Sequence, residues 1–189
     1  MSIRLTTGSR IAETSSKGNQ EKWLADGRWY KLDLFGLAEA VTSALLAQTN
    51  TDALGFRYVT YRMERMEVHG HIRNGCSSAN FLRQGEAILT LAELLRRTAE
   101  LNTAFVVGLP VADWQTAVNR LSNLQSRLAW LVEQVERLTG LDRFGTYLTL
   151  LFEVDMLFGN EDRHLNNIAV LRCGDGFDYC PIFDFGAGL

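Results

Sequence analysis

The stretch GNEDRHLNNIAVLRCGDGFDYCPIFDFGAGL, residues 159–189, decides the fold. It contains two runs typical of strands, NIAVLR and DYCPIFDF, separated by the turn sequence CGDGF, which is the pattern of a β-hairpin. Because a hairpin returns the chain to the end at which it began, Asn167 at its entry and Asp184 at its exit are predicted to lie together. Asp162 precedes the hairpin by a few residues. The pattern therefore predicts that two carboxylates and one amide converge.

Oxygen ligands of this kind suit magnesium. Mg²⁺ binds a few protein oxygens and completes its coordination with water and phosphate oxygens. We therefore predict Asn167 and Asp184 as metal ligands. Each residue alone would be interpreted as capping a turn or ending a strand, so the functional interpretation depends on their spacing.

The spacing is that of protein kinases. In these enzymes a catalytic-loop Asp accepts the hydroxyl proton, an Asn five residues later binds metal, and the Asp of a DFG motif binds metal. Asp162 and Asn167 are five residues apart, and Asp184-Phe185-Gly186 is a DFG sequence. The spacing predicts Asp162, Asn167 and Asp184 as catalytic residues, with ATP and Mg²⁺ as cofactors.

The order Asp162-Arg163-His164 reverses the His-Arg-Asp of ordinary protein kinases. With the Asn and DFG that follow, it resembles the phosphatidylinositol 3- and 4-kinases and, more closely, the bacterial HipA-like kinases. The segments SKGNQEKW…WYK and GCSSANF (residues 75–81) are similar to those of bacterial proteins with a HipA-like C-terminal domain. The resemblance implies an α+β, bilobal protein-kinase-like fold, a Ser/Thr hydroxyl of a protein as substrate, and an antitoxin-like or regulatory protein as a possible partner.

The change from strand patterns to helix patterns along the sequence predicts the organisation of the chain. We expect a β-rich N-lobe over residues 1–84 and a mainly helical C-lobe over residues 85–189. The sequence ends three residues after Gly186, whereas kinase-like domains continue with an activation segment and helices. We therefore expect the C-lobe to be truncated.

A kinase N-lobe supplies a lysine and a turn that covers the phosphates. Lys31, in the predicted strand GRWYKLDL, is the candidate lysine. The polar turn upstream contains Ser16, Lys17 and Gly18, whose small size and charge suit phosphate contacts. The HipA-like resemblance points to the same turn, since those proteins use a short Ser/Gly-rich loop. The alternative is a plain hairpin with an exposed lysine.

A kinase lysine is held by a carboxylate. Glu39, at the start of the helix that follows, is predicted to pair with Lys31, and Glu13 is the competing partner. An acid in the first turn of a helix is favoured by the helix dipole in any case.

The remaining elements are predicted from periodicity. Two strands are expected around Asp26-Gly27, followed by a helix over residues 36–48 and strands over residues 57–72. Helices are then expected over residues 86–101 and 112–140, and a buried helix over residues 144–159. The expected buried face of the first helix consists of Leu37, Val41, Ala44 and Leu45.

Composition excludes several classes of protein. The 189 residues carry a formal net charge of −3 and have a pI near 5.6, which gives no basic surface for direct nucleic-acid binding. No apolar run approaches the roughly 20 residues of a membrane span, so no membrane association is expected. Three cysteines, an odd number, do not suggest a disulfide framework and favour a cytoplasmic location.

Two functions from different classes remain. The first is an ATP-dependent phosphotransferase of the HipA-like type, a serine/threonine kinase. The second is a nucleotide-binding module without turnover, either a pseudokinase or a toxin–antitoxin interaction domain. Retention of Asp162, Asn167 and Asp184 favours the first, and the expected truncation favours the second.

Overall fold

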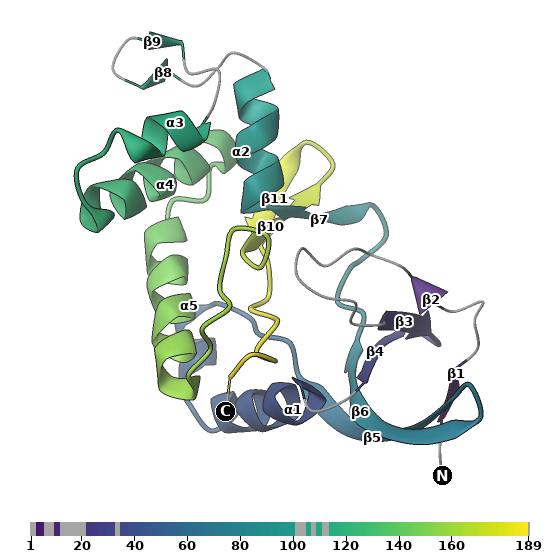
Figure 1. Cartoon of the computed structure of the whole chain (residues 1–189). Coiled ribbons are helices and arrows are strands. Elements are labelled where there is room, and N and C mark those ends of the chain that lie inside the picture. The colour runs from purple at the N-terminus through teal and green to yellow at the C-terminus, as the bar shows by residue number, and fades with distance from the viewer. Residues whose placement is uncertain are drawn as a thin grey trace. The chain divides into compact units, whose positions relative to one another are not determined.

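The computed structural model describes residues 3–5, 10–11, 22–32, 35–100, 105–106, 109–110 and 114–188. The fold is α+β, and the chain forms two compact units (Figure 1). The first unit contains residues 1–82, 152–163 and 181–189, and the second contains residues 83–151 and 164–180. The expected lobe boundary after residue 84 stays a prediction. In the described part of the chain, no helix combines the length and apolar character needed to cross a membrane.

A six-stranded sheet forms the body of the first unit, in the order β1-β5-β6-β4-β3-β2. Its strands are β1 (Ile3–Leu5), β2 (Arg10–Ile11), β3 (Lys22–Ala25), β4 (Arg28–Leu32), β5 (Tyr61–Val68) and β6 (His71–Ala79). β1 pairs with β5 in parallel, and the other pairs are antiparallel. The predicted β3–β4 hairpin is confirmed: Asp26 and Gly27 have positive φ values of 50° and 69°, the left-handed conformation that tight hairpin turns require.

The two faces of this sheet differ in chemistry. One face carries a buried apolar cluster of Trp23, Tyr30, Leu32, Met66 and Val68. Helix α1 (Phe35–Leu46) lies against β4, β5 and β6, and Figure 1 shows it beside β5 and β6. A side chain at Gly36 would meet the Cys76 backbone nitrogen at 2.9 Å. Glycine at this position therefore lets the helix lie directly on the strand.

The buried face of α1 differs from the prediction. Leu37 and Leu45 are 50% and 47% exposed. The buried residues of the helix instead include the polar Glu39, Thr42 and Ser43, together with Ala38, Ala40 and Leu46. The sheet beneath α1 presents polar partners, since the Ser43 hydroxyl accepts a 3.0 Å hydrogen bond from the Tyr61 N–H. A hydrophobic pattern could not predict a helix that buries a polar face.

The second unit contains a three-stranded antiparallel sheet of order β11-β10-β7. Its strands are β7 (Glu86–Thr90), β10 (Ala169–Cys173) and β11 (Gly176–Tyr179), and the predicted β10–β11 hairpin is confirmed. The other elements are α2 (Leu91–Glu100), β8 (Phe105–Val106), β9 (Leu109–Pro110), α3 (Trp114–Asn119), α4 (Leu124–Thr139) and α5 (Phe144–Phe158). α5 contributes its first part to this unit and residues 152–158 to the first. A short 3₁₀ helix, η2 (Thr51–Leu54), also belongs to the first unit.

Two helix predictions need correction. Residues 86–90 form a strand, because the register of β7 with β10 pairs Leu89 with Val170, a long-range contact that overrides the local helical spacing. The long helix predicted over residues 112–140 is split into α3 and α4. Asn123 caps α4 by accepting a 2.8 Å hydrogen bond from the Ser126 N–H. The helix predicted over residues 144–159 is confirmed as α5, but it is not buried all round, because Met156 and Leu157 are 81% and 69% exposed.

Candidate active site

Lys31 lies on the α1 side of β4, opposite Cys76 of β6. Its ammonium group forms an ion pair with the Glu39 carboxylate, and the two side chains are 11% and 1% exposed. Glu39, one of the two acids considered as partners, therefore contacts Lys31. The competing acid, Glu13, lies outside the described residues. Glu39 is the fifth residue of α1, in its second turn, so the dipole of the first turn does not explain its presence.

The DFG sequence lies at the same ion pair. Asp184 Oδ1 is 3.0 Å from Lys31 Nζ, and the Phe185 N–H donates a 3.0 Å hydrogen bond to Glu39 Oε2. Glu39 thus uses both oxygens, one for the lysine and one for the DFG backbone. Phe185 is 1% exposed and packs edge-on against Tyr61, with ring centroids 6.3 Å apart.

The main chain around Asp184 has an unusual conformation. The second strand of the hairpin ends at Tyr179, earlier than predicted, and Asp184 follows in an irregular segment. Ile182 joins this segment to the rest of the first unit through 2.8 Å backbone bonds with Arg57 and Val59. Asp184 has a φ of 65°, which non-glycine residues adopt rarely and which the surrounding structure must therefore hold.

The charges of the site reinforce one another. The Lys31 ammonium lowers the pKa of Asp184 to about 2, against the opposing effect of burial. Burial alone would lower the pKa of Lys31, but the negative charges of the Glu39 and Asp184 carboxylates outweigh it and raise the pKa well above its usual value. At neutral pH the site therefore holds a permanent cation between two acidic residues.

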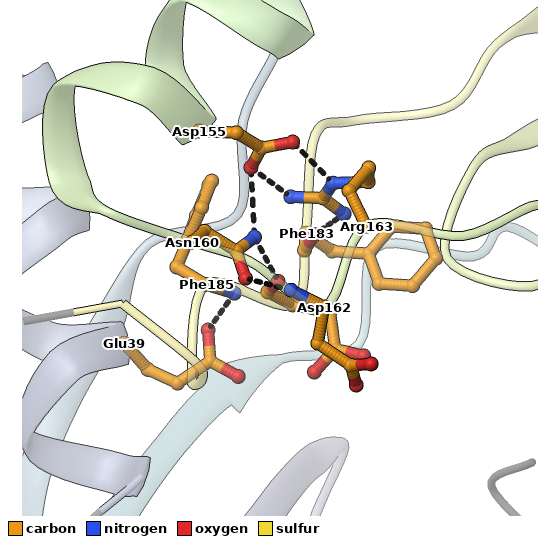
Figure 2. Close-up of polar contacts among 8 residues, drawn as sticks. Glu39, Asp155, Asn160, Asp162, Arg163, Phe183 and Phe185 are labelled. Atoms are coloured by element: carbon orange, nitrogen blue, oxygen red, sulfur yellow. Dashed lines mark hydrogen bonds and ion pairs between the residues drawn. The ribbon is translucent and has the colours of Figure 1, made fainter. Parts of the chain in front are cut away.

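The loop that contains Asp162 follows α5 through a tight helix end. Gly159 has a φ of 67°, and the Asn160 N–H donates a 2.8 Å hydrogen bond to the Asp155 carbonyl, the Schellman pattern of a helix C-terminus. This turn brings Asn160 and Arg163 back to Asp155, as Figure 2 shows. Arg163 binds the Asp155 carboxylate with Nε and Nη2, both at 2.8 Å.

Asp162 belongs to the same loop of the first unit. Its N–H donates a 3.4 Å hydrogen bond to Asn160 Oδ1. In Figure 2 the Asp162 carboxylate points away from the Asp155–Arg163 ion pair.

The structure does not test every predicted residue. Asn167 lies in the second unit, where its N–H donates a 2.8 Å hydrogen bond to the His164 carbonyl. Its convergence with Asp184 stays a prediction. Ser16, Lys17 and Gly18 lie outside the described residues.

Three residues of this region had no role assigned from the sequence: Asp155, Asn160 and Arg163. One signal for Asp155 was available, because it is one of two acids in the otherwise apolar helix α5. A buried acid requires a partner, and Asp155 is 6% exposed. Its partners come from beyond the helix end and could not be identified by helical spacing.

No protein-family model matches the sequence, and no curated protein matches it either. Among solved structures, the fold is similar to that of the proinflammatory kinase CtkA from Helicobacter pylori, with a TM-score of 0.60 and 16% sequence identity. The alignment covers 100% of this chain and 61% of that kinase, so the chain spans about three-fifths of its length. The chain therefore has a kinase-like α+β fold.

Proposed function

We propose that the protein is an ATP- and Mg²⁺-dependent phosphotransferase. The observation that supports this most strongly is the buried group of Lys31, Glu39 and Asp184, in which a lysine on a strand is held by a helix glutamate beside a DFG aspartate. Protein kinases use a strand lysine, a helix glutamate and a DFG aspartate to bind and orient the phosphates of ATP.

Lys31 is the proposed phosphate-binding cation. Its raised pKa keeps it protonated at neutral pH, and Glu39 fixes the ammonium group from the helix side. A cation that is already ordered and mostly withdrawn from water binds a phosphate oxygen without the cost of immobilising a flexible side chain.

Asp184 is the proposed metal ligand. With a pKa near 2 it stays ionised at neutral pH, and carboxylate oxygens are suitable ligands for Mg²⁺. Among the described residues there is no group of three or more His, Cys, Asp or Glu side chains that could hold a metal by themselves. Asp184 and Asn167, the second proposed protein ligand, would supply one carboxylate and one amide oxygen. Two such ligands fit a Mg²⁺ ion that also binds phosphate oxygens. When bound, Mg²⁺ neutralises phosphate charge.

Asp162 is the proposed acceptor of the substrate hydroxyl proton. Its position, five residues before Asn167, is that of the catalytic Asp in kinase loops. Orienting the hydroxyl matters because phosphoryl transfer depends mainly on positioning and charge stabilisation.

We further propose that the enzyme is of the HipA-like type and phosphorylates Ser or Thr hydroxyls of a protein. The Asp-Arg-His order and the Asn that follows support this assignment, and so does the preceding Gly159-Asn160 pair. An antitoxin-like regulatory partner belongs to the same proposal.

Transfer from γ-labelled ATP in the presence of Mg²⁺ tests the proposal. Asp162→Asn should leave ATP affinity within about twofold and reduce transfer by about 10²–10⁴-fold, the usual contribution of a general base. Mg²⁺-dependent ATP binding without transfer by the wild-type protein would favour a nucleotide-binding module without turnover.

A further inference from the structure

We propose that Asp155, Asn160 and Arg163 are positioning residues that set the location of Asp184 and of the Asp162 loop. We call these three residues the Asp155 clamp. The inference rests on the proposed function, because its consequence is measured as metal-dependent ATP binding.

The centre of the clamp is the buried Asp155 carboxylate. It accepts hydrogen bonds from three donors: Arg163 Nε at 2.8 Å, Arg163 Nη2 at 2.8 Å and Asn160 Nδ2 at 2.7 Å. Two parallel bonds from one guanidinium fix the orientation of both groups. Since Asp155 lies on α5, the clamp is anchored to a regular helix.

The clamp also reaches the main chain on both sides of the site. Arg163 Nη1 donates a 2.9 Å hydrogen bond to the Phe183 carbonyl. Asn160 Nδ2 is 3.4 Å from the Asp184 carbonyl, and Asn160 Oδ1 is 3.4 Å from the Asp162 nitrogen. Figure 2 shows these bonds converging between the loop and the DFG segment. The Arg163 contact is the shorter, so it restrains the segment more strongly.

Asp184 needs this support because of its backbone conformation. Its φ of 65° is disfavoured for aspartate. The contacts that hold it include Tyr61 at its backbone N–H, Asn160 at its carbonyl, Lys31 at its carboxylate and Glu39 at the following N–H. The last two belong to the proposed nucleotide site, and the clamp supplies the restraint from outside it. Release of the clamp should let Asp184 relax toward a commoner conformation and move its carboxylate.

The clamp also accounts for residues whose role was unassigned. Asn160 and Arg163 lie on either side of the proposed catalytic loop Asp, at positions 160 and 163 of GNEDRH. Gly159 permits the left-handed helix end that returns both side chains to Asp155. Metal ligands are commonly oriented by such supporting hydrogen bonds, whose loss costs about 10–100-fold in metal affinity or activity.

The test uses Asn160→Ala and Arg163→Lys. These substitutions remove the hydrogen bonds from the clamp to the main chain of the loop and of the DFG segment. They do not replace Lys31, Glu39 or Asp184. Asn74→Ala is the control, because Asn74 is an exposed residue of β6. The measurement is the Mg²⁺ concentration that gives half-maximal thermal stabilisation by ATP. We expect it to rise about 10-fold or more in both clamp variants, with metal-free ATP affinity unchanged. A lowered melting temperature with an unchanged Mg²⁺ requirement would overturn the positioning role.

Hydrogen exchange separates failure of this inference from failure of the proposed function. In both clamp variants, but not in Asn74→Ala, the amides of residues 183–188 should exchange faster. Unchanged exchange there would overturn the clamp whether or not the protein binds Mg-ATP. A wild-type protein without Mg²⁺-dependent stabilisation by ATP would overturn the metal-positioning role together with the proposed function.

Discussion

Replacing Lys31 by methionine should destabilise the protein in a pH-dependent way. The substitution keeps the length and much of the packing of the side chain but leaves Glu39, whose side chain is 1% exposed, without its cation. Removing one partner of a buried ion pair costs about 3–5 kcal/mol. That is a large part of the 5–15 kcal/mol that stabilises a typical domain. Urea unfolding at pH 7 should show a loss of this size.

The pH dependence follows from Asp184. Lys31 lowers its pKa from 3.8 to about 2 in the folded state, a difference worth about 2–3 kcal/mol. Because the folded pKa lies below the unfolded one, this contribution is complete above about pH 4 and disappears as the pH falls through about 2. Lys31→Met removes the largest cause of this lowered pKa, so the stability difference from wild type should shrink between pH 4 and pH 2.

Lys22→Met is the comparison. Lys22 lies opposite Lys31 on β3 and lowers the pKa of Asp184 less than Lys31 does. Its replacement should cost less than about 1 kcal/mol, as expected for a partly exposed charge. A difference below about 1 kcal/mol for Lys31→Met at pH 7, unchanged down to pH 2.5, would refute the assigned role of the buried ion pair.

Three further predictions concern the same unit. Glu39→Gln keeps an oxygen for the Phe185 N–H but removes the charge that holds Lys31. Calorimetry should show roughly tenfold weaker ATP binding, which corresponds to the lower end of the free energy of a hydrogen bond to a charged group. Gly75→Ala would press a Cβ against the Lys31 carbonyl oxygen and should cost at least about 1–3 kcal/mol in thermal unfolding. Gly176→Ala should be nearly neutral, because its Cβ would meet one backbone oxygen at 3.7 Å. Burial and the charge of Glu39 raise the pKa of Cys76 to about 12, so iodoacetamide at pH 8 should label this thiol only after unfolding, as mass spectrometry can show.

Local chemistry made parts of the fold predictable. The Asp26-Gly27 and Gly174-Asp175-Gly176 turns mark two hairpins, because positive φ values are needed at tight turns and these residues tolerate them. α5 was predictable from its continuous apolar sequence. The strand over residues 86–90 was not, because its partner β10 lies about 80 residues later.

The candidate site also has residues that the sequence could predict and contacts that it could not. The motif spacing predicted Asp162, Asn167 and Asp184 as site residues, and the strand context predicted Lys31. Of these, the structure brings Lys31 and Asp184 together. The buried face of α1 was predicted wrongly, because the helix turns Glu39 inward to meet Lys31 and leaves Leu37 exposed. The partners of Asp155 depend on the turn at Gly159, and hydrophobic periodicity carries no information about such a contact.

The central claim is that Lys31, Glu39 and Asp184 form a Mg²⁺-dependent ATP site. Calorimetric titration of ATP into wild-type protein and Asp184→Ala, each with and without Mg²⁺, tests it most directly. Mg²⁺ should strengthen ATP binding to the wild-type protein and have no effect on Asp184→Ala, because the proposed carboxylate ligand has been removed. An equal strengthening by Mg²⁺ in both proteins, or no ATP binding by the wild-type protein, would contradict the claim.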